Sequence, residues 1–268
     1  LSYPTCRVCD NPHLDFSGCL GNLPQINRCS PNAKEAKQLQ RIPVNLYFCK
    51  HCYHFQLGES FDPEETFRAY SYATQYTPSI KKHGLRIVDW FQNKYGMKKN
   101  AFVVELASND GAILRSFMDS GFRNVLGIEP AKNIARIARK NGIKTEAEFF
   151  SRAYAQHVSK RFGNADFVLA RHVLAHVPQT VDFLKGIRDI LAPNGICCIE
   201  TPYGRNLIDY MEFDSIYHEH LSYYIVTTLQ YLLGCAGLHI IDIEKINIHT
   251  GSIAVFAART ESRWSLSP

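Results

Sequence analysis

VVELASNDG, residues 103–111, is an apolar run that breaks into a small, polar turn ending in glycine. Such a run is typical of a buried strand that leads into a helix, and open α/β sheets bind ligands at this end of the strand. The turn has a single glycine, Gly111, and lacks the GxGxxG spacing that cradles a pyrophosphate. The stretch therefore predicts an α/β fold and disfavours an NAD-dependent oxidoreductase.

Strand and helix patterns alternate outward from this turn. Strands are expected at 102–106, at 125–128, near 144, at 166–170 and at 196–200, and helices at 112–120, 131–141, 151–162 and 181–191. This alternation predicts a parallel, doubly wound sheet. A helix expected at 222–234 precedes two strands, 238–243 and 252–257, whose connection is too short for a parallel crossover. The sheet is therefore expected to close with an antiparallel strand.

The chain divides into three parts by composition. Residues 1–63 are rich in Cys, Pro, Asn and Gly and lack an apolar period, so no conventional core is expected there. Residues 64–97 have a helical pattern and are predicted to form a helical connector. Residues 98–268 contain the predicted α/β domain.

Two CxxC pairs lie in the first part, Cys6 with Cys9 and Cys49 with Cys52. Each pair can present two thiolates to one tetrahedral zinc ion, and a site closed by four thiolates has no open position for a reactant. The pairs therefore predict a structural zinc site. Alternative ligands, the two histidines being the weaker ones, are Cys19, Cys29, His51 and His54.

Composition excludes several classes of protein. The chain of 268 residues is 46% hydrophobic and 21% charged, and no apolar stretch approaches the roughly 20 residues of a membrane span, so neither a disordered nor a membrane-spanning protein fits. The net charge of +5 is scattered and by itself does not distinguish an acidic small substrate from nucleic acid. Near the CxxC pairs only Lys34, Lys37, Arg41 and Lys50 are basic, so no nucleic-acid partner is expected. An odd number of cysteines, nine, and the absence of a signal-like start predict a reducing, cytoplasmic location.

FDSIYHEHL, residues 213–221, follows the fifth strand and has an unusual density of titratable groups. Histidine titrates near neutral pH, so it can remove a proton beside a carbonyl group without a large pKa perturbation. The strand at 125–128 leads into Glu129, whose carboxylate is placed to accept hydrogen bonds from two ribose hydroxyls. Both segments are expected at the edge where the cofactor turn lies.

These motifs occur in a distinctive order. The four-cysteine module is followed by Gln56 and Leu57, the YSY segment at 70–72, the ELASNDG loop and FDSIYHEHL. In this order they resemble class I S-adenosylmethionine methyltransferases, and more narrowly the zinc-containing sugar C-methyltransferases that act on nucleotide-linked keto-deoxysugars. The sequence departs from that family at Ala107, where the family has glycine, and at Thr250 in the turn 249–252, which is expected to touch substrate. The family also continues past the equivalent of residue 268 into a further α/β domain, and the resemblance implies that this domain is missing from the chain.

The resemblance implies a class I methyltransferase sheet, parallel with one antiparallel closing strand, preceded by a small zinc-binding domain. It implies S-adenosylmethionine and structural Zn²⁺ as cofactors, and a nucleotide-linked sugar as the small-molecule partner. The implied reaction is C-methylation through an enolate. His220 is the implied base, Glu219 and Tyr217 position groups or stabilise the enolate oxygen, and His176 donates to that oxygen.

The resemblance also implies a set of cofactor-binding residues: Tyr72, Glu105, Ala107, Asn109, Asp110, Gly111, Glu129, Pro130, Arg171 and His172. His218 is expected to be structural, because two histidines so close in a turn cannot both face one cavity. Two other functions stay open. One is methylation of oxygen or nitrogen on another small molecule, and the other is a non-catalytic module in which the zinc knuckles bind a partner.

Overall fold

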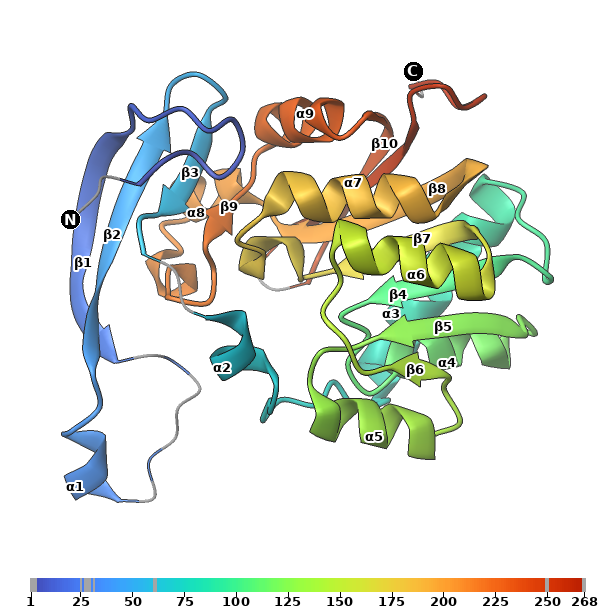
Figure 1. Ribbon diagram of the computed structural model, residues 1–268, viewed down its shortest axis with the longest axis horizontal. Helices are drawn as coiled ribbons and strands as arrows, with labels where there is room; N and C mark the ends of the chain where they lie inside the picture. Colours follow the sequence, from blue (N-terminus) through green and yellow to red (C-terminus); the bar gives the residue numbers. More distant parts are fainter. Residues whose placement is uncertain are drawn as a thin grey trace.

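The computed structural model describes residues 4–24, 26, 30, 32–59, 62–248 and 251–266, which form two β-sheets (Figure 1). The larger sheet has seven strands in the order β10-β11-β8-β7-β4-β5-β6. The smaller sheet has four strands in the order β1-β2-β3-β9 and lies at the amino-terminal side of the molecule.

The larger sheet confirms the predicted fold class. Its strands are β4 (Phe102–Leu106), β5 (Asn124–Ile128), β6 (Thr145–Glu146), β7 (Ala165–Arg171), β8 (Leu191–Pro202), β10 (Leu238–Ile246) and β11 (Ser252–Arg259). The pairs from β6 to β8 are parallel, whereas β11 is antiparallel to both of its neighbours. Chain order reverses between β4 and β7, and sheets of this kind bind ligands in the crevice at that point.

Helices cover both faces of this sheet, because strand side chains alternate between the faces. Phe102 and Val104 of β4 pack with α6 (Arg152–Phe162), α7 (Thr180–Ile190) and α9 (Val226–Cys235). Val103 packs on the other face with α3 (Pro78–Asp89) and α4 (Ala112–Asp119). The other helical segments are α1 (Ala33–Ala36), α2 (Pro63–Phe67), α5 (Lys132–Lys140), α8 (Gly204–Asp209) and the short turns Trp90–Lys94, Leu174–His176 and Phe213–Ser215.

The smaller sheet includes a strand from late in the chain. It consists of β1 (Asp15–Pro24), β2 (Arg41–Cys49), β3 (His54–Leu57) and β9 (Ser222–Tyr223). Because β9 pairs with β3, the helix expected at 222–234 begins only at Val226, and that prediction was wrong at its start. The backbone of residues 222–223 is satisfied by β3 instead of by a helical turn.

The connector is helical only in part, which corrects the expectation for residues 64–97. Helices α2 and α3 are separated by an irregular segment, residues 68–77, called the strap below. Pro78 disfavours helical geometry at Thr77, and the strap instead bonds to loops of the larger sheet. Among the described residues, every helix is too short or too polar to cross a membrane.

Candidate active site and metal centre

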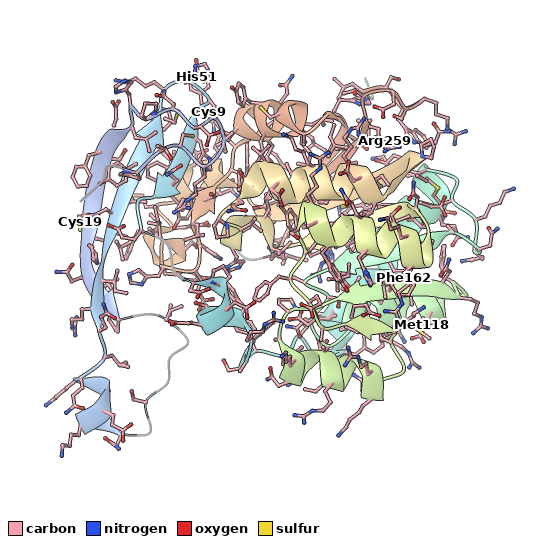
Figure 2. All side chains as sticks on the ribbon, viewed as in Figure 1. Cys9, Cys19, His51, Met118, Phe162 and Arg259 are labelled. Atoms are coloured by element: carbon pink, nitrogen blue, oxygen red, sulfur yellow. The ribbon has the colours of Figure 1, made fainter. Side chains whose placement is uncertain are left out.

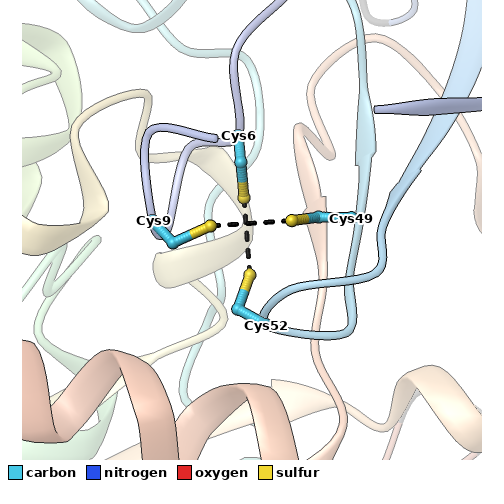
Figure 3. Close-up of side chains that lie close together, drawn as sticks. All are labelled: Cys6, Cys9, Cys49 and Cys52. Carbon is cyan, nitrogen blue, oxygen red and sulfur yellow. Dashed lines mark hydrogen bonds between the residues drawn. The ribbon is translucent and has the colours of Figure 1, made fainter. Parts of the chain in front are cut away.

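Four cysteine side chains converge between the two CxxC knuckles, the first at residues 6–9 and the second at residues 49–52 (Figure 3). The Sγ atoms of Cys6 and Cys52 lie 3.5 Å apart, those of Cys9 and Cys49 lie 3.6 Å apart, and all four lie within 4.8 Å of one another. Zinc–sulfur bonds of about 2.3 Å place tetrahedral ligands about 3.8 Å apart, so this donor set fits a zinc ion. A hydrogen bond from Cys52 lowers the pKa of Cys6 to about 5, which favours a thiolate at the site.

The alternative zinc ligands face elsewhere. Cys19 is exposed on β1, well away from Cys9 (Figure 2). The ring of exposed His51 lies against Tyr231, and His54 is hydrogen-bonded through Nε2 to the Ser222 hydroxyl at 3.1 Å. Cys29 lies outside the described residues.

A cavity of about 1840 Å³ opens at the carboxyl ends of β4, β5 and β7. The predicted site residues in its wall are Tyr72, Glu105, Ala107, Asn109, Glu129, Pro130, Arg171, His172, His176, Tyr217 and His220. Asp110, Gly111 and Glu219 lie outside the wall. The volume exceeds the roughly 300–1,000 Å³ of most pockets for one small molecule, so it has room for two ligands at once.

The polar side chains of the cofactor loop hold the strap in place. Asn109 Oδ1 accepts a hydrogen bond from the Thr74 N–H, and Asp110 Oδ2 accepts one from the Gln75 N–H, both at 2.8 Å. Asp110 Oδ1 also accepts from the N–H of Ala112, at the start of α4. Asp110 therefore connects three segments beside the cavity without lining it.

Three residues of the loop, Ala107, Asn109 and Gly111, have left-handed backbone geometry that affects its shape. Gly111 has φ 78°, and a Cβ atom there would lie 2.6 Å from the Ile143 side chain, so glycine is required. Ala107 has φ 50°, and the resembling family has glycine at this position. The loop therefore approaches the cavity through a conformation that side chains disfavour.

Two buried carboxyl groups face the loop with different hydrogen bonding. Glu129 accepts main-chain N–H groups of Asn109 and Ala131, each at 2.8 Å. Oε2 of Glu105 has no hydrogen-bond partner among the described residues. Burial raises the pKa of Glu105 to about 8, although Arg171 opposes the shift. Such a group favours a ligand that donates hydrogen bonds or has a positive charge.

A buried ion-pair network supports the floor of the cavity. Arg171 donates to Glu200 at 2.8 Å, and His83 donates to the same carboxylate at 2.9 Å. Burial alone would raise the pKa of Glu200, but Arg171 and His83 outweigh it and lower the pKa to about 2. His83 and Glu200 were not predicted as site residues, since they are 117 positions apart and no motif joins them.

His220 is held in one tautomer by its neighbours. Its Nδ1–H donates to the Ser215 carbonyl at 3.0 Å, because a carbonyl can only accept. The hydroxyl of Tyr217 donates to the other nitrogen, Nε2, at 2.8 Å. In the neutral ring the Nε2 lone pair accepts from Tyr217, and both side chains line the cavity, where a base would act.

Three further groups surround this pair. The rings of His176 and His220 are in edge contact, with centroids 4.9 Å apart. Burial is the main cause that lowers the pKa of His176 to about 3, and the nearby His220 is the second. His176 donates to the main chain of Glu219, and its Nδ1 has no partner among the described residues. The Tyr70 hydroxyl donates to Glu219 at 3.4 Å. Tyr70 was not predicted as a site residue, although it belongs to the YSY segment. Tyr72 of the same segment was predicted, and its side chain is 56% exposed.

The chain matches two described protein families. Residues 73–243 match a family described as "Methyltransferase domain", and residues 6–67 match one described as "Putative zinc binding domain". These matches agree with the predicted class I methyltransferase sheet and with the predicted zinc-binding module, whose four cysteines lie together. The chain belongs to the methyltransferase-domain family.

Individual relatives agree with this assignment. C-methyltransferase NovU from Streptomyces niveus is 31% identical over 263 residues, which are 98% of this chain and 62% of NovU. The chain thus spans less than two thirds of the length of that relative. A methyltransferase from Archaeoglobus fulgidus shares the fold with a TM-score of 0.54 at 16% identity, over 72% of this chain and 96% of that one. A second, from Clostridium acetobutylicum, has a TM-score of 0.52 at 11% identity, over 67% and 92%.

Proposed function

We propose that this protein transfers a methyl group to a carbon beside the carbonyl of a nucleotide-linked keto-deoxysugar. The observation that carries the proposal is an oriented His220, hydrogen-bonded through both ring nitrogens, in the same cavity as the cofactor loop. The identity to a C-methyltransferase supports carbon as the acceptor, and the motif order supports the sugar class. The cavity volume supports simultaneous binding of cofactor and acceptor.

The loop end of the cavity fits S-adenosylmethionine, which supplies an electrophilic methyl group when bound. The unpartnered Oε2 of Glu105 suits an ammonium group, and Glu129 has lone pairs left for ribose hydroxyls. Further contacts are assigned to Tyr72, Ala107, Asn109, Pro130, Arg171 and His172, which line the same cavity. Asp110 and Gly111 shape the loop without lining the cavity.

His220 acts as the base in this proposal. Nε2 removes the proton beside the carbonyl, while the bond from Nδ1 to Ser215 keeps the ring in place. Before Nε2 takes this proton, the Tyr217 hydroxyl turns from Nε2 to the carbonyl oxygen of the substrate, which frees the Nε2 lone pair and provides a donor for the enolate oxygen that forms. The proton and the developing negative charge therefore each have a partner.

The groups around this pair have supporting roles. His176 stays neutral because of its lowered pKa, and its N–H is committed to the main chain of Glu219. Its Nδ1 is then an acceptor, so we assign it to a hydroxyl of the sugar instead of the enolate oxygen. Glu219, which accepts from Tyr70, orients Tyr70 at the cavity wall.

Two measurements on the zinc-loaded chain test the proposal. Titration with S-adenosylhomocysteine, with NAD as the control ligand, tests the cofactor site. Exchange of the substrate's α-proton with D₂O in the presence of S-adenosylhomocysteine tests the base without methyl transfer. We expect His220→Ala to slow this exchange by about 100-fold or more, the usual contribution of a general base, with cofactor affinity within about two-fold of the unchanged chain. His157→Ala, on the exposed side of α6, is the matched control.

Each result has a defined meaning. Exchange at the normal rate in His220→Ala would show that another group is the base. A product whose ¹³C-methyl group is bonded to oxygen would favour the O-methyltransferase alternative. No binding of S-adenosylhomocysteine would favour the non-catalytic module.

A further inference from the structure

We propose that the hairpin made by β2, the second knuckle and β3, residues 41–57, is a positioning element for His220. His218 is the positioning residue through which it acts. This inference rests on the proposed function, because it assumes that His220 is the base. It gives the zinc site a role in the geometry of catalysis as well as in folding.

The catalytic segment is attached to this hairpin on both sides of His220. Before it, His218 donates from Nε2 to the carbonyl of Ile42 on β2 at 3.1 Å. After it, the carbonyl of Leu221 accepts from the N–H of Leu57 at 3.0 Å, and Ser222 pairs with Gln56. His220 is therefore held between two attachments that belong to the same hairpin.

The two histidines of the YHEH segment are directed to different partners. His218 is 2% exposed and bonds to β2, whereas His220 lines the cavity and bonds to Tyr217 and Ser215. A shift of His218 would move the backbone two residues away, which carries His220. Displacements of about 1 Å at a catalytic group can slow a reaction 100-fold.

Apolar packing makes the hairpin and the segment move together. Ile216 and Tyr223, on either side of YHEH, form one buried cluster with Val44 and Leu46 of β2 and Leu57 of β3. On the opposite side, the N–H of Leu221 donates to the carbonyl of Ala175 at 2.8 Å, which attaches the segment to the turn that follows β7 of the larger sheet. The segment is thus clamped between the hairpin and the cavity.

Zinc would set the shape of the hairpin at its turn. β2 ends at Cys49 and β3 begins just after Cys52, so two of the four ligands close the connection between the strands. Coordination of these two thiolates and those of Cys6 and Cys9 to one ion would fix the angle at which the strands leave the turn. Without the ion, the anchors for His218 and Ser222 would lose this constraint.

The test reads the imidazole of His220 directly. The full, zinc-loaded chain, labelled with ¹⁵N-histidine, is compared by NMR with His218→Leu and with His218→Gln, which keeps a donor for Ile42. Thr228→Val is the matched control, because Thr228 also bonds the hairpin, to the Tyr53 carbonyl at 2.8 Å, but from α9. The unchanged chain after zinc removal with a chelator forms a further sample. S-adenosylhomocysteine affinity is measured for every sample.

We expect a fixed Nδ1–H tautomer of His220 in the unchanged chain, in His218→Gln and in Thr228→Val. In His218→Leu and in the zinc-free chain we expect a mixture of tautomers. The cofactor affinity of His218→Leu should stay within about two-fold of that of the zinc-loaded, unchanged chain. α-Proton exchange in His218→Leu should show a kcat lowered about ten-fold or more and a nearly unchanged KM.

A fixed His220 tautomer in His218→Leu would overturn the inference. Loss of the fixed tautomer in Thr228→Val or in His218→Gln, to the same extent as in His218→Leu, would also overturn it. These outcomes are separate from failure of the proposed function. If the unchanged chain did not bind S-adenosylhomocysteine, the proposed function would fail while the tautomer still reported the attachment of His220 to the hairpin.

Discussion

Ala107 has a backbone φ of 50° at the point where the cofactor loop meets the cavity. An L-residue in this region is strained by about 1–2 kcal/mol, whereas glycine is not. The position also bears the methyl group that distinguishes this loop from the resembling family. Single residues here affect both the stability of the loop and the space for a ligand.

Ala107→Gly is expected to raise the free energy of unfolding by up to about 1 kcal/mol, since relief of strain exceeds the added flexibility of the unfolded chain. Affinity for S-adenosylhomocysteine should stay the same or increase. Urea unfolding and calorimetry measure the two effects. Ala135→Gly, the same change inside α5, should instead lower stability by about 1 kcal/mol. Equal destabilisation by both variants would contradict the argument.

Glu105 makes stability depend on pH. Its folded pKa, about 8, is above the usual value of a glutamate, so the folded state binds more protons between those two values. The stability contributed by the protonated form is complete at low pH and is lost as pH rises toward 8, by at most about 1.4 kcal/mol per pH unit. Glu105→Gln should flatten this decline in thermal unfolding between pH 5 and about pH 8, whereas exposed Glu35→Gln should not. An unchanged slope in Glu105→Gln would exclude Glu105 as its source.

At the scale of elements, the strap shows how a short segment is fixed without regular structure. Its backbone donors at Thr74 and Gln75 bond to the side chains of Asn109 and Asp110. These bonds replace the helical hydrogen bonds that the connector pattern predicts. The strap therefore depends on the cofactor loop, and the wall of the cavity depends on the strap.

Asp110→Asn tests this dependence. The aspartate uses one oxygen for Gln75 and the other for Ala112, whereas asparagine has a single oxygen and can accept only one of these bonds well. We expect faster hydrogen exchange in the strap and a loss of about 1 kcal/mol in stability. Asp209→Asn, in an exposed i, i+4 pair with Arg205, is the control. Unaltered exchange at residues 72–76 would show that the strap is held by other contacts.

At the scale of the whole molecule, two sheets with different sources of stability share one active site. The larger sheet has buried clusters on both faces, whereas the smaller sheet has a cluster of five buried residues besides the cysteine site. Structural zinc contributes about 10–16 kcal/mol in isolated zinc-finger peptides, so a small sheet of this kind depends on its ion.

Zinc removal should therefore act unequally on the two sheets. We expect chelation, or Cys49→Ser, to abolish hydrogen-exchange protection in β1–β3, while strands β4, β5 and β7 stay protected. Mass spectrometry should show that the chain loses about one bound zinc ion together with this change. Cys235→Ser, an exposed cysteine outside the cluster, serves as the control. Equal protection of β2 with and without zinc would show that the sheet is stable without the ion.

Local sequence determined the order of strands and helices, the antiparallel closure and the four zinc ligands. The apolar periods and the CxxC spacings act over a few residues, so they can be interpreted without knowing the fold. Motif order was enough to identify the family. The same local signals failed at residues 222–223 and in the strap, where distant partners replaced helical bonds.

Only the tertiary structure decided which side chains meet. Glu200 joins His83 across 117 positions, and His218 joins Ile42 across 176. Tyr70, and not the more exposed Tyr72, contacts Glu219. Sequence patterns specify which face of an element is buried, but the contacts between elements depend on how the sheets pack, and packing is a property of the whole chain.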